Sequence, residues 1–337
     1  MAMFKRGHEI DGSVVLVTGA SSGIGRAAAR RFAESGADLV LTARSPEDID
    51  RIALECQAHG SEVLTMLADV GDERQVQELA KVAIEHFGRI DAWINNAGVI
   101  AYGRFEDMPS EVFDGVIRTN LLGQVYGARA ALEQFRRQGS GVLVNLASVW
   151  GRVTSPNVVP YVVSKHGIRA FSECLREGLA ASEGTEDIHV VTVLPESVDT
   201  PIFQHAANYT GREVKPVFPV VGVQRAARAI VAAVRRPRGE ITVGQVGHAV
   251  ALLAGLVPRQ LFERIAPRIF EHTALEESEA EPSPGNVLRP EPDLNRVEGG
   301  RRRGLGRQAG RLTVGVVGLG APVVAAGLTV RRARHKG

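Results

Sequence analysis

The alternation of two patterns between Val14 and Gly244 constrains the fold of this chain most strongly. Short apolar runs rich in β-branched residues alternate with longer stretches of helical periodicity, which is typical of βαβ units and of a parallel sheet covered on both faces. The runs expected to be strands are VVLVTG, DLVLTA, EVLTMLAD, IDAWINNA, SGVLVNLAS, HVVTVLP and EITVG. We therefore expect one α/β domain with a doubly wound sheet over residues 9–272, and ligands beyond the carboxyl ends of its strands.

The C-terminal part of the chain is expected to extend this domain. Residues 246–272 predict one or two short helices, interrupted by Pro258 and Pro267. Residues 273–311 are rich in Glu and Pro and then in Arg and Gly, a composition that predicts a disordered linker. Residues 312–330 carry no charge and as a helix would be roughly 28 Å long, close to the thickness of a bilayer. They predict either a membrane anchor or, because of their glycines, a weakly ordered tail.

Composition and charge narrow the class of protein. The net charge of +2 is too small to indicate nucleic-acid binding. Cys56 and Cys174 are the two cysteines and lie outside any metal-binding spacing, so neither a disulfide framework nor a metal site is indicated. The N-terminus shows no apolar signal segment, and we expect a cytoplasmic protein, with membrane association if residues 312–330 form an anchor.

A glycine-rich turn follows the first expected strand, where residues 18–25 read TGASSGIG. Glycines let the backbone approach a pyrophosphate, whose charge is then stabilised by the N-terminus of the next helix, although such turns also occur without a ligand. Asp-Val closes the third strand and Asn-Asn-Ala-Gly the fourth, at the same sheet edge. The expected cofactor contacts here are Gly19, Ser21, Ser22, Gly23, Ile24, Gly25, Asp69, Val70, Asn96, Ala97 and Gly98.

The end of the second expected strand indicates which nucleotide is bound. An acidic residue there would bond the ribose 2′-hydroxyl and repel a 2′-phosphate, whereas an arginine does the opposite. The chain reads Thr42-Ala43-Arg44-Ser45, without an acid. Arg44 therefore predicts NADP(H) in preference to NAD(H), the alternative being an exposed loop cation.

Three residues that could carry proton transfer follow in order. Ser148 ends one expected strand, and Tyr161 and Lys165 lie four residues apart at the start of the next helix, so they share one helix face. The ammonium should favour the phenolate and lower the pKa of Tyr161 from its usual value of about 10, which suits a general acid or base. Ser148 would polarise the substrate oxygen. The order of these residues behind the glycine turn argues against coincidence.

Together these motifs resemble the short-chain dehydrogenase/reductase family over about Gly12–Gly244, about two-thirds of the chain. The resemblance implies a Rossmann-type fold and an NADP(H)-dependent oxidoreductase that transfers hydride between the nicotinamide and a carbonyl or alcohol. By this resemblance NNAG stabilises the fourth strand, and Ser148, Tyr161 and Lys165 form a catalytic triad. Asn120, in RTNLLG, matches the family's fourth catalytic residue, which would hold a water that links Lys165 to solvent.

The resemblance also implies further cofactor contacts. Tyr161 and Lys165 would lie beside the nicotinamide ribose, and Pro195 to Thr200 resembles the segment that covers the nicotinamide, with Val198 and Thr200 meeting its carboxamide. The chain departs from the family by carrying Glu196 where glycine is usual. We expect that side chain to point to solvent and to change little. Homodimers or homotetramers are common in the family, through the helices that here begin at Asn120 and carry Tyr161.

The segments that bound the substrate in this family are here apolar and aromatic: Ile100, Tyr102, Val149, Trp150, Val153, Ile202, Phe203, His205 and Tyr209. They predict a hydrophobic aldehyde, ketone, steroid-like or lipid-like substrate, with Ser148, Trp150, Tyr161 and Phe203 in contact. His205 is expected to be an exposed loop residue. The alternatives are reduction of a carbon–carbon double bond, an NAD-linked dehydrogenase, or a non-catalytic NADP(H)-binding sensor or scaffold, the last disfavoured by the intact set of four catalytic residues.

Overall fold

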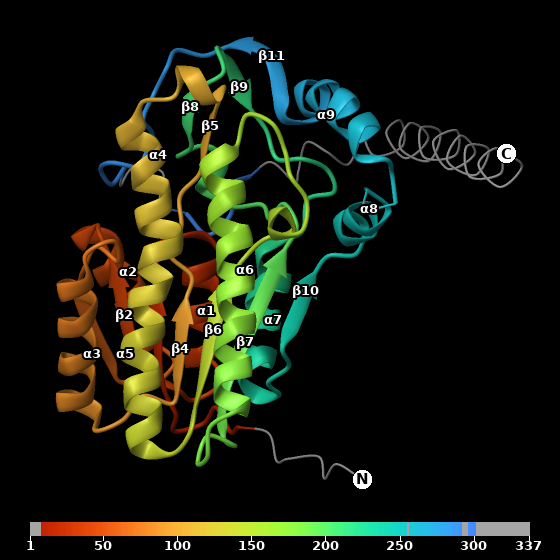
Figure 1. Cartoon of the computed structure of the whole chain (residues 1–337). Coiled ribbons are helices and arrows are strands. Elements are labelled where there is room, and N and C mark those ends of the chain that lie inside the picture. The colour runs from red at the N-terminus through yellow and green to blue at the C-terminus, as the bar shows by residue number, and fades with distance from the viewer. Residues whose placement is uncertain (1–7, 255, 292–295, 301–337) are drawn as a thin grey trace, which may run out of the picture.

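A parallel sheet of 7 strands forms the centre of the computed structural model, which describes residues 8–254, 256–291 and 296–300 (Figure 1). Its order is β10-β7-β6-β4-β1-β2-β3. The strands are β1 (Val14–Thr18), β2 (Asp38–Ala43), β3 (Val63–Leu67), β4 (Ala92–Asn95), β6 (Gly141–Leu146), β7 (Ile188–Pro195) and β10 (Glu240–Val243). Each expected run is a strand, and the doubly wound α/β fold is confirmed.

Burial on both faces explains why the strands are continuous apolar runs. Every residue of β1, β4 and β6 is buried, as expected for a parallel sheet covered by helices on either side. On one face lie α1 (Gly23–Ala33), α2 (Pro46–Gln57) and α7 (Val223–Arg235), which share a core of small and branched side chains with the sheet. On the other lie α3 (Glu73–Phe87), α5 (Gly123–Gln138) and α6 (Val159–Ala180), around Trp93 and Phe135.

Local signals set the ends of the helices. Asp72 caps α3, because its side chain accepts a hydrogen bond from the backbone N–H of Arg74. The same helix ends at Gly88 with a φ of 75°, a left-handed conformation that glycine adopts without steric cost.

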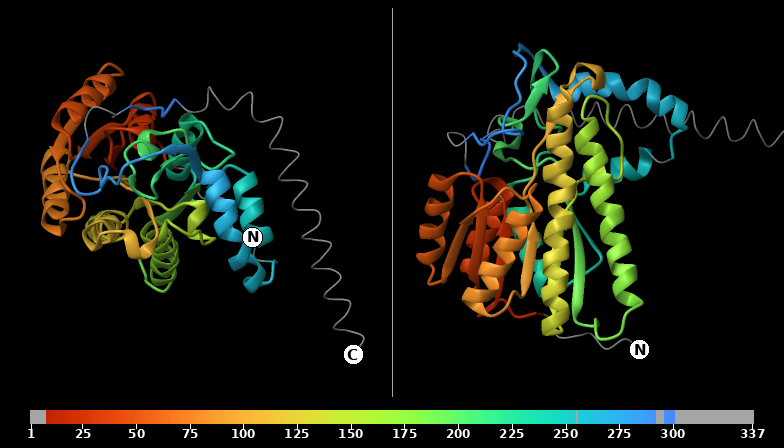
Figure 2. Two further views of the ribbon diagram at one scale, coloured as in Figure 1. Left: turned by 90° about the horizontal axis from the view of Figure 1, so that it is seen from above. Right: turned by 60° about the vertical axis from the view of Figure 1, so that its left-hand side comes forward.

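Smaller elements cover the carboxyl ends of the strands (Figures 1 and 2). There β5 (Ala101–Gly103) pairs with β8 (Ala207–Tyr209), and β9 (Arg212–Val214) pairs with β11 (Leu275–Glu279). The helical elements of this layer are α4 (Ser110–Ile117), a π-helical turn at Arg118–Leu122 and single 3-10 turns at Phe105–Asp107, Val149–Gly151 and Pro201–Phe203. The layer forms the roof of the site described below.

One or two short helices are expected after the sheet, and the structure has two, α8 (Val246–Ala254) and α9 (Arg259–Ala274). Pro258 separates them, as predicted, whereas Pro267 lies inside α9. Phe270 and Ala274 of α9 are buried in an apolar cluster with Tyr102 and Phe203, so α9 extends the core over the site.

The disordered linker expected over residues 273–311 is wrong for the residues up to 300 that the structure describes. Leu275 to Glu279 form β11, and further on Ser283 and Asn208 exchange two backbone hydrogen bonds of 2.8 and 2.9 Å. Val287 is only 3% exposed. Low average hydrophobicity misled the prediction, because Leu275 and Val287 enter cores that other segments had already formed.

Residues 301–311 and the apolar run 312–330 lie outside the described residues. Among the helices that the structure describes, none combines the length and the hydrophobicity needed to cross a bilayer.

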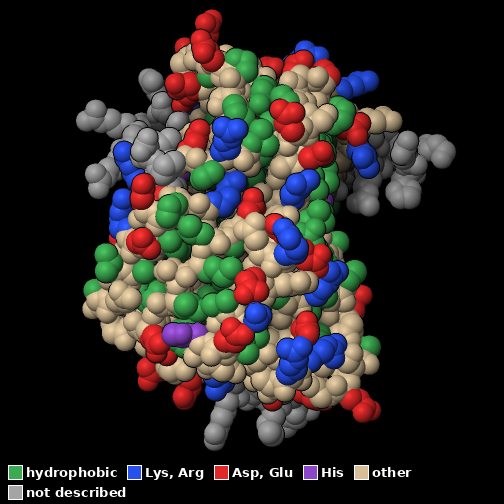
Figure 3. All heavy atoms as spheres, turned by 90° about the vertical axis from the view of Figure 1, so that its left-hand side faces the viewer, with side chains coloured by type: hydrophobic (Ala, Val, Ile, Leu, Met, Phe, Trp, Pro, Cys, Tyr) green, Lys and Arg blue, Asp and Glu red, His purple; other side chains and the backbone are tan. Residues whose placement is uncertain are grey.

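The face formed by α2 and α3 carries acidic and basic side chains side by side (Figure 3). Exposed ion pairs on it, such as those of Lys81 with Glu78 and Glu85, contribute little to stability.

Candidate active site

A cleft with a cavity volume of about 180 Å³ lies at the carboxyl edge of the sheet. It lies where the strand order reverses between β1 and β4, the place where doubly wound sheets bind ligands. The predicted cofactor residues that line it are Gly19, Ser21, Ser22, Gly23, Ile24, Arg44, Asp69, Val70, Asn96, Ala97, Gly98, Tyr161, Lys165, Pro195 and Thr200. The structure therefore brings most of that set together.

Two predicted cofactor residues, Gly25 and Val198, lie behind the lining. A Cβ at Gly25 would come within 2.2 Å of the carbonyl oxygen of Gly19 and 2.4 Å of the Asn96 amide nitrogen. Gly25 therefore lets the turn fold onto itself, rather than contacting a ligand. Val198 is buried and pairs with Val221, which holds the backbone beneath Thr200.

The Asn-Asn-Ala-Gly motif holds the glycine turn in place. The side-chain amide of Asn96 donates to the carbonyl oxygens of Thr18 and Gly19, at 2.9 and 3.1 Å. Gly19 has a φ of 65°, and a Cβ there would come within 2.8 Å of Ala97 Cα. The backbone thus forms a cradle that side chains would fill, which fits the close approach of a pyrophosphate to the N-terminus of α1.

Arg44 lies at the end of β2 and lines the cleft. Burial lowers the pKa of its guanidinium, while the nearby carboxylate of Asp69 acts in the opposite direction. Its terminal nitrogens donate to two backbone carbonyls, Asn286 O at 2.6 Å and Val287 O at 3.4 Å. Arg44 is therefore not the exposed loop cation of the alternative interpretation.

The proton-transfer residues converge at the other end of the cleft. The Tyr161 hydroxyl is hydrogen-bonded to the Ser148 side chain. Lys165 Nζ lies 5.4 Å from the centre of the Tyr161 ring and donates to the carbonyl oxygen of Leu146 at 2.8 Å. A phenol, a hydroxyl and an ammonium from β6 and α6 thus meet where the cleft opens onto the apolar roof.

Burial governs the titration of both groups. It raises the pKa of Tyr161 to about 12, more than the hydrogen bond from Ser148 lowers it, and it lowers the pKa of Lys165 to about 8. The expectation that Lys165 lowers the pKa of Tyr161 is therefore wrong for the chain by itself. The reason is that transfer from water disfavours the charged form of each group. Tyr161 is a neutral phenol, able to donate a proton.

Asn120 lies in the π-helical turn between α4 and α5, a distortion that often marks functional sites. Its amide is fully buried, accepts from the backbone N–H of Val99 at 2.8 Å and donates to Val99 O at 2.9 Å and to Ser164 Oγ at 3.2 Å. Asn120 thus fixes the backbone at Val99, in the loop between β4 and β5 that follows Gly98. Its role in a proton relay stays a prediction.

Apolar side chains cover Tyr161 on the substrate side. The Trp150 ring packs edge to face on the Tyr161 ring, with centroids 5.7 Å apart. Phe203 and Ile202 belong to the same cluster, and Ile202 also lines the cleft. Tyr102 is fully buried against Phe270 and is a core residue.

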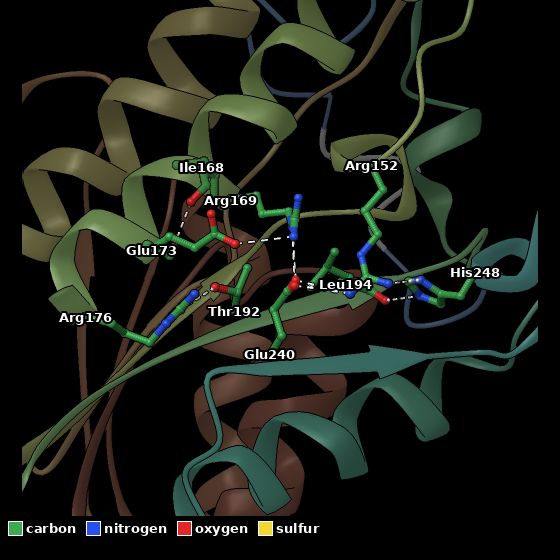
Figure 4. A network of polar contacts seen from close by, with 10 residues as sticks. Arg152, Ile168, Arg169, Glu173, Arg176, Thr192, Leu194, Glu240 and His248 are labelled. Carbon is green, nitrogen blue, oxygen red and sulfur yellow. Dashed lines mark hydrogen bonds and ion pairs between the residues drawn. The ribbon is translucent and has the colours of Figure 1, made fainter. Parts of the chain in front are cut away.

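A polar network fixes the loop that follows Ser148 (Figure 4). Both carboxylate oxygens of Glu240 accept from Arg152 at 3.1 Å, and Arg169 of α6 donates to them at 3.0 and 3.2 Å. Burial by itself would raise the pKa of Glu240, but these hydrogen bonds outweigh it and hold the pKa below its usual range. Arg152 is thereby tied to β10 and, through Glu240, to α6, which orders the loop beside Ser148.

Glu196 does not point to solvent, and that expectation is wrong. The side chain is buried, and its Oε1 accepts from the backbone N–H groups of Gly247 at 2.7 Å and His248 at 3.3 Å. These N–H groups belong to the first turn of α8, where backbone N–H groups have no acceptor within the helix. Glu196 therefore caps α8.

His205 is also buried rather than exposed, and it lines the cleft. Its backbone carbonyl accepts from the N–H of Asn286 at 2.9 Å.

The sequence did not predict three lining residues from the C-terminal part of the chain, Asn286, Pro290 and Glu291. A signal was available in Pro284-Gly285, a turn dipeptide that interrupts an otherwise polar stretch.

Comparison with known proteins agrees with this geometry. A family model described as short chain dehydrogenase matches residues 13–210. The uncharacterized oxidoreductase YxnA of Bacillus subtilis (strain 168) is 32% identical over 280 residues, which cover 82% of this chain and 77% of that protein.

Two solved structures share the fold. A short chain dehydrogenase/reductase from Burkholderia phymatum in complex with NAD has a TM-score of 0.66 at 27% identity, over 77% of this chain and 96% of that one. An alcohol dehydrogenase from the archaeon Thermococcus sibiricus complexed with 5-hydroxy-NADP has a TM-score of 0.60 at 29% identity, over 69% and 96%. With the glycine turn, the tyrosine and the lysine all at one cleft, the chain belongs to the short-chain dehydrogenase family of oxidoreductases.

Proposed function

We propose that the chain transfers hydride between NADP(H) and a hydrophobic carbonyl or alcohol, with Tyr161 as general acid and base. One observation carries the proposal. The Tyr161 hydroxyl, bonded to Ser148, lies at the cleft that is also lined by the glycine turn and by Lys165. A carbonyl oxygen placed against this hydroxyl pair would receive its proton there.

The nicotinamide, when bound, supplies or accepts the hydride. Ser148 holds the substrate oxygen by a hydrogen bond and so stabilises the negative charge that develops on it during reduction. Tyr161, a neutral phenol because of its raised pKa, donates the proton. Lys165 lies over the phenol ring and stabilises the phenolate that remains after the transfer. In the reverse direction the phenolate accepts the proton of the alcohol.

Arg44 supports the choice of NADP(H). Its guanidinium lines the adenosine end of the cleft, and a planar, permanently charged fork is the side chain best suited to a phosphate. Ala43 precedes it, so no carboxylate ends β2 to bond a ribose hydroxyl.

The apolar cover of Tyr161 supports a hydrophobic substrate. Trp150, Ile202 and Phe203 pack around the phenol, and binding sites for small apolar molecules are lined in this way. Aldehydes, ketones and steroid-like or lipid-like carbonyls are the classes that this cover suits.

Substitution of the tyrosine tests the reaction. Tyr161→Phe removes the proton donor, and we expect turnover of a panel of hydrophobic carbonyls with NADPH to fall by about 10² to 10⁴, while the Kd for NADPH stays unchanged. The matched control is Tyr126→Phe, because Tyr126 is a half-buried residue of α5 that packs against the core cluster and does not line the cleft. Full turnover in Tyr161→Phe would refute the role of Tyr161, whereas no turnover in the unchanged chain with NADPH bound would favour a cofactor-binding protein without catalysis.

A further inference from the structure

The C-terminal residues 283–291, which we name the strap, cross the cofactor cleft at its adenosine end. Asn286, Pro290 and Glu291 line the cleft together with the glycine turn. The carbonyls of Asn286 and Val287 accept hydrogen bonds from Arg44. Beyond the strap, the carbonyl of Arg296 accepts from the N–H of Gly23 at 2.9 Å. The C-terminal chain therefore contacts both elements that would hold the phosphates of a dinucleotide.

The strap is anchored by groups that do not bind a cofactor. Val287 is 3% exposed and packs in a cluster with Met108, Val112 and Val116 of the α4 region. Ser283 is paired with Asn208 through backbone hydrogen bonds. Because these anchors lie outside the cleft, the strap does not need a bound nucleotide to stay in position.

The turn at Gly285, within the strap, allows little displacement of the backbone. Gly285 has a φ of 49°, and a Cβ there would come within 2.3 Å of His205 O. Asn286 follows, with its N–H on that same carbonyl and its side-chain amide 3.3 Å from His205 Nδ1. The carbonyls that face Arg44 are consequently fixed by their own neighbours.

The guanidinium of arginine has five N–H donors in one plane. Two of them are directed at the strap carbonyls, which fixes that plane and leaves three for another acceptor. Arg44 and the strap line the same cleft, which has a cavity volume of about 180 Å³. We propose that the strap is a specificity-determining wall of the cofactor cleft, which orients Arg44 toward the ribose 2′-phosphate of NADP(H). This inference rests on the cofactor role of Arg44 proposed above.

A double-mutant cycle in the full chain tests the positioning role. Val287→Asn loosens the strap, and Arg44→Ala removes the guanidinium that the strap positions. The Kd values for NADPH and NADH are measured for both single variants and for the double variant. We expect Val287→Asn to raise the Kd for NADPH about tenfold and the Kd for NADH less than twofold. In the Arg44→Ala background Val287→Asn should have no further effect on NADPH, because the two residues act through one interaction.

Two matched controls separate positioning from general damage. Leu288→Asn makes the neighbouring change at an exposed side chain and should leave both Kd values unchanged. Should Val287→Asn fail to fold, Gly285→Ala displaces the strap by the clash with His205 O, and Gly60→Ala controls for it, since Gly60 also has a positive φ but no atom within 4 Å of the added Cβ.

The outcomes distinguish the inference from the proposed function. Equal losses for NADPH and NADH, or additive effects in the cycle, overturn the role of the strap and leave Arg44 as the phosphate ligand. If Arg44→Ala does not change the preference for NADPH, both the strap inference and the role of Arg44 as the phosphate ligand are wrong. If the unchanged chain does not prefer NADPH, the proposed choice of NADP(H) is wrong, and the catalytic role of Tyr161 is judged separately by Tyr161→Phe.

Discussion

Lys165, for which we propose a catalytic role, lies where burial of its charge opposes stability. Its ammonium is buried, and burial lowers its pKa from 10.5 to about 8. One hydrogen bond from Nζ, to Leu146 O, offsets part of the cost of transfer from water. Lys165 Nζ lies 5.4 Å from the centre of the Tyr161 ring, so the proposed stabilisation of the phenolate gives this buried charge a use that folding does not.

Replacement of Lys165 should therefore stabilise the chain without cofactor. Between pH values of about 8 and 10.5 the unfolded chain binds the proton more tightly than the folded one, so stability rises with pH in that range and the full cost of the charge is present below it. Lys165→Met should raise the free energy of unfolding near neutral pH by about 1–3 kcal/mol, while turnover is lost. Urea unfolding at several pH values measures the free energy of unfolding, and oxidation of NADPH with hydrophobic carbonyls measures the turnover.

The pH dependence gives this prediction its control. The advantage of Lys165→Met should shrink as the pH rises above about 8, whereas Lys81→Met, at an exposed lysine of α3, should show no such trend. A constant difference from neutral to alkaline pH would mean that packing, and not the charge, distinguishes the variant.

The sequence predicted the positions of the reacting residues because each follows a local pattern. Ser148 ends an apolar run, and Tyr161 and Lys165 share a helical spacing, so the fold determines where they meet. Glu196 and His205 were placed wrongly because their partners, Gly247 and Asn286, lie 51 and 81 residues away. The pKa of Tyr161 was also not predictable, because it depends on burial by side chains from several elements.

Among the elements, α8 is held at its N-terminus by Glu196, a residue that follows β7. Its first N–H groups bond the carboxylate of Glu196, which follows β7, and His248 of the same helix bonds Leu194 O at 3.0 Å. Glu196 and its helix lie beside the loop that Arg152 orders.

Removal of this cap should loosen α8. Glu196→Ala leaves the N–H groups of Gly247 and His248 without their acceptor, and we expect a loss of about 1–2 kcal/mol in the free energy of unfolding. Glu196→Gln keeps an oxygen in place and should retain most of the stability. Denaturant unfolding of both variants, with the exposed Glu85→Ala as a control, measures the effect; equal losses in Ala and Gln would show that charge, not capping, matters.

The strand and helix pattern was predictable, whereas β11 and the strap were not. Seven apolar runs with helices between them leave few arrangements that satisfy the backbone and the crossover rule. In contrast, a polar segment with two buried side chains, Leu275 and Val287, gives no periodic signal. Its order comes from docking onto β9 and the α4 region.

At the scale of the whole molecule, the cleft joins parts of the chain that are far apart in sequence. Its lining runs from Gly19, after the first strand, to Glu291, in the strap. A ligand that contacts all of these parts binds only the folded chain, so its binding energy adds to the stability of the entire domain. The same linkage makes thermal unfolding a measure of cofactor choice, independent of any substrate.

We therefore expect NADPH to raise the melting temperature more than NADH at equal concentrations. At a concentration about 100 times its Kd a ligand adds about 2.7 kcal/mol, which for a domain of this size corresponds to a shift of about 5 °C or more. Arg44→Ala should reduce the NADPH shift to that of NADH, because the 2′-phosphate then has no partner at the end of β2. Equal shifts in the unchanged chain would instead assign Arg44 to holding the strap alone, since its two carbonyl hydrogen bonds do not require a phosphate.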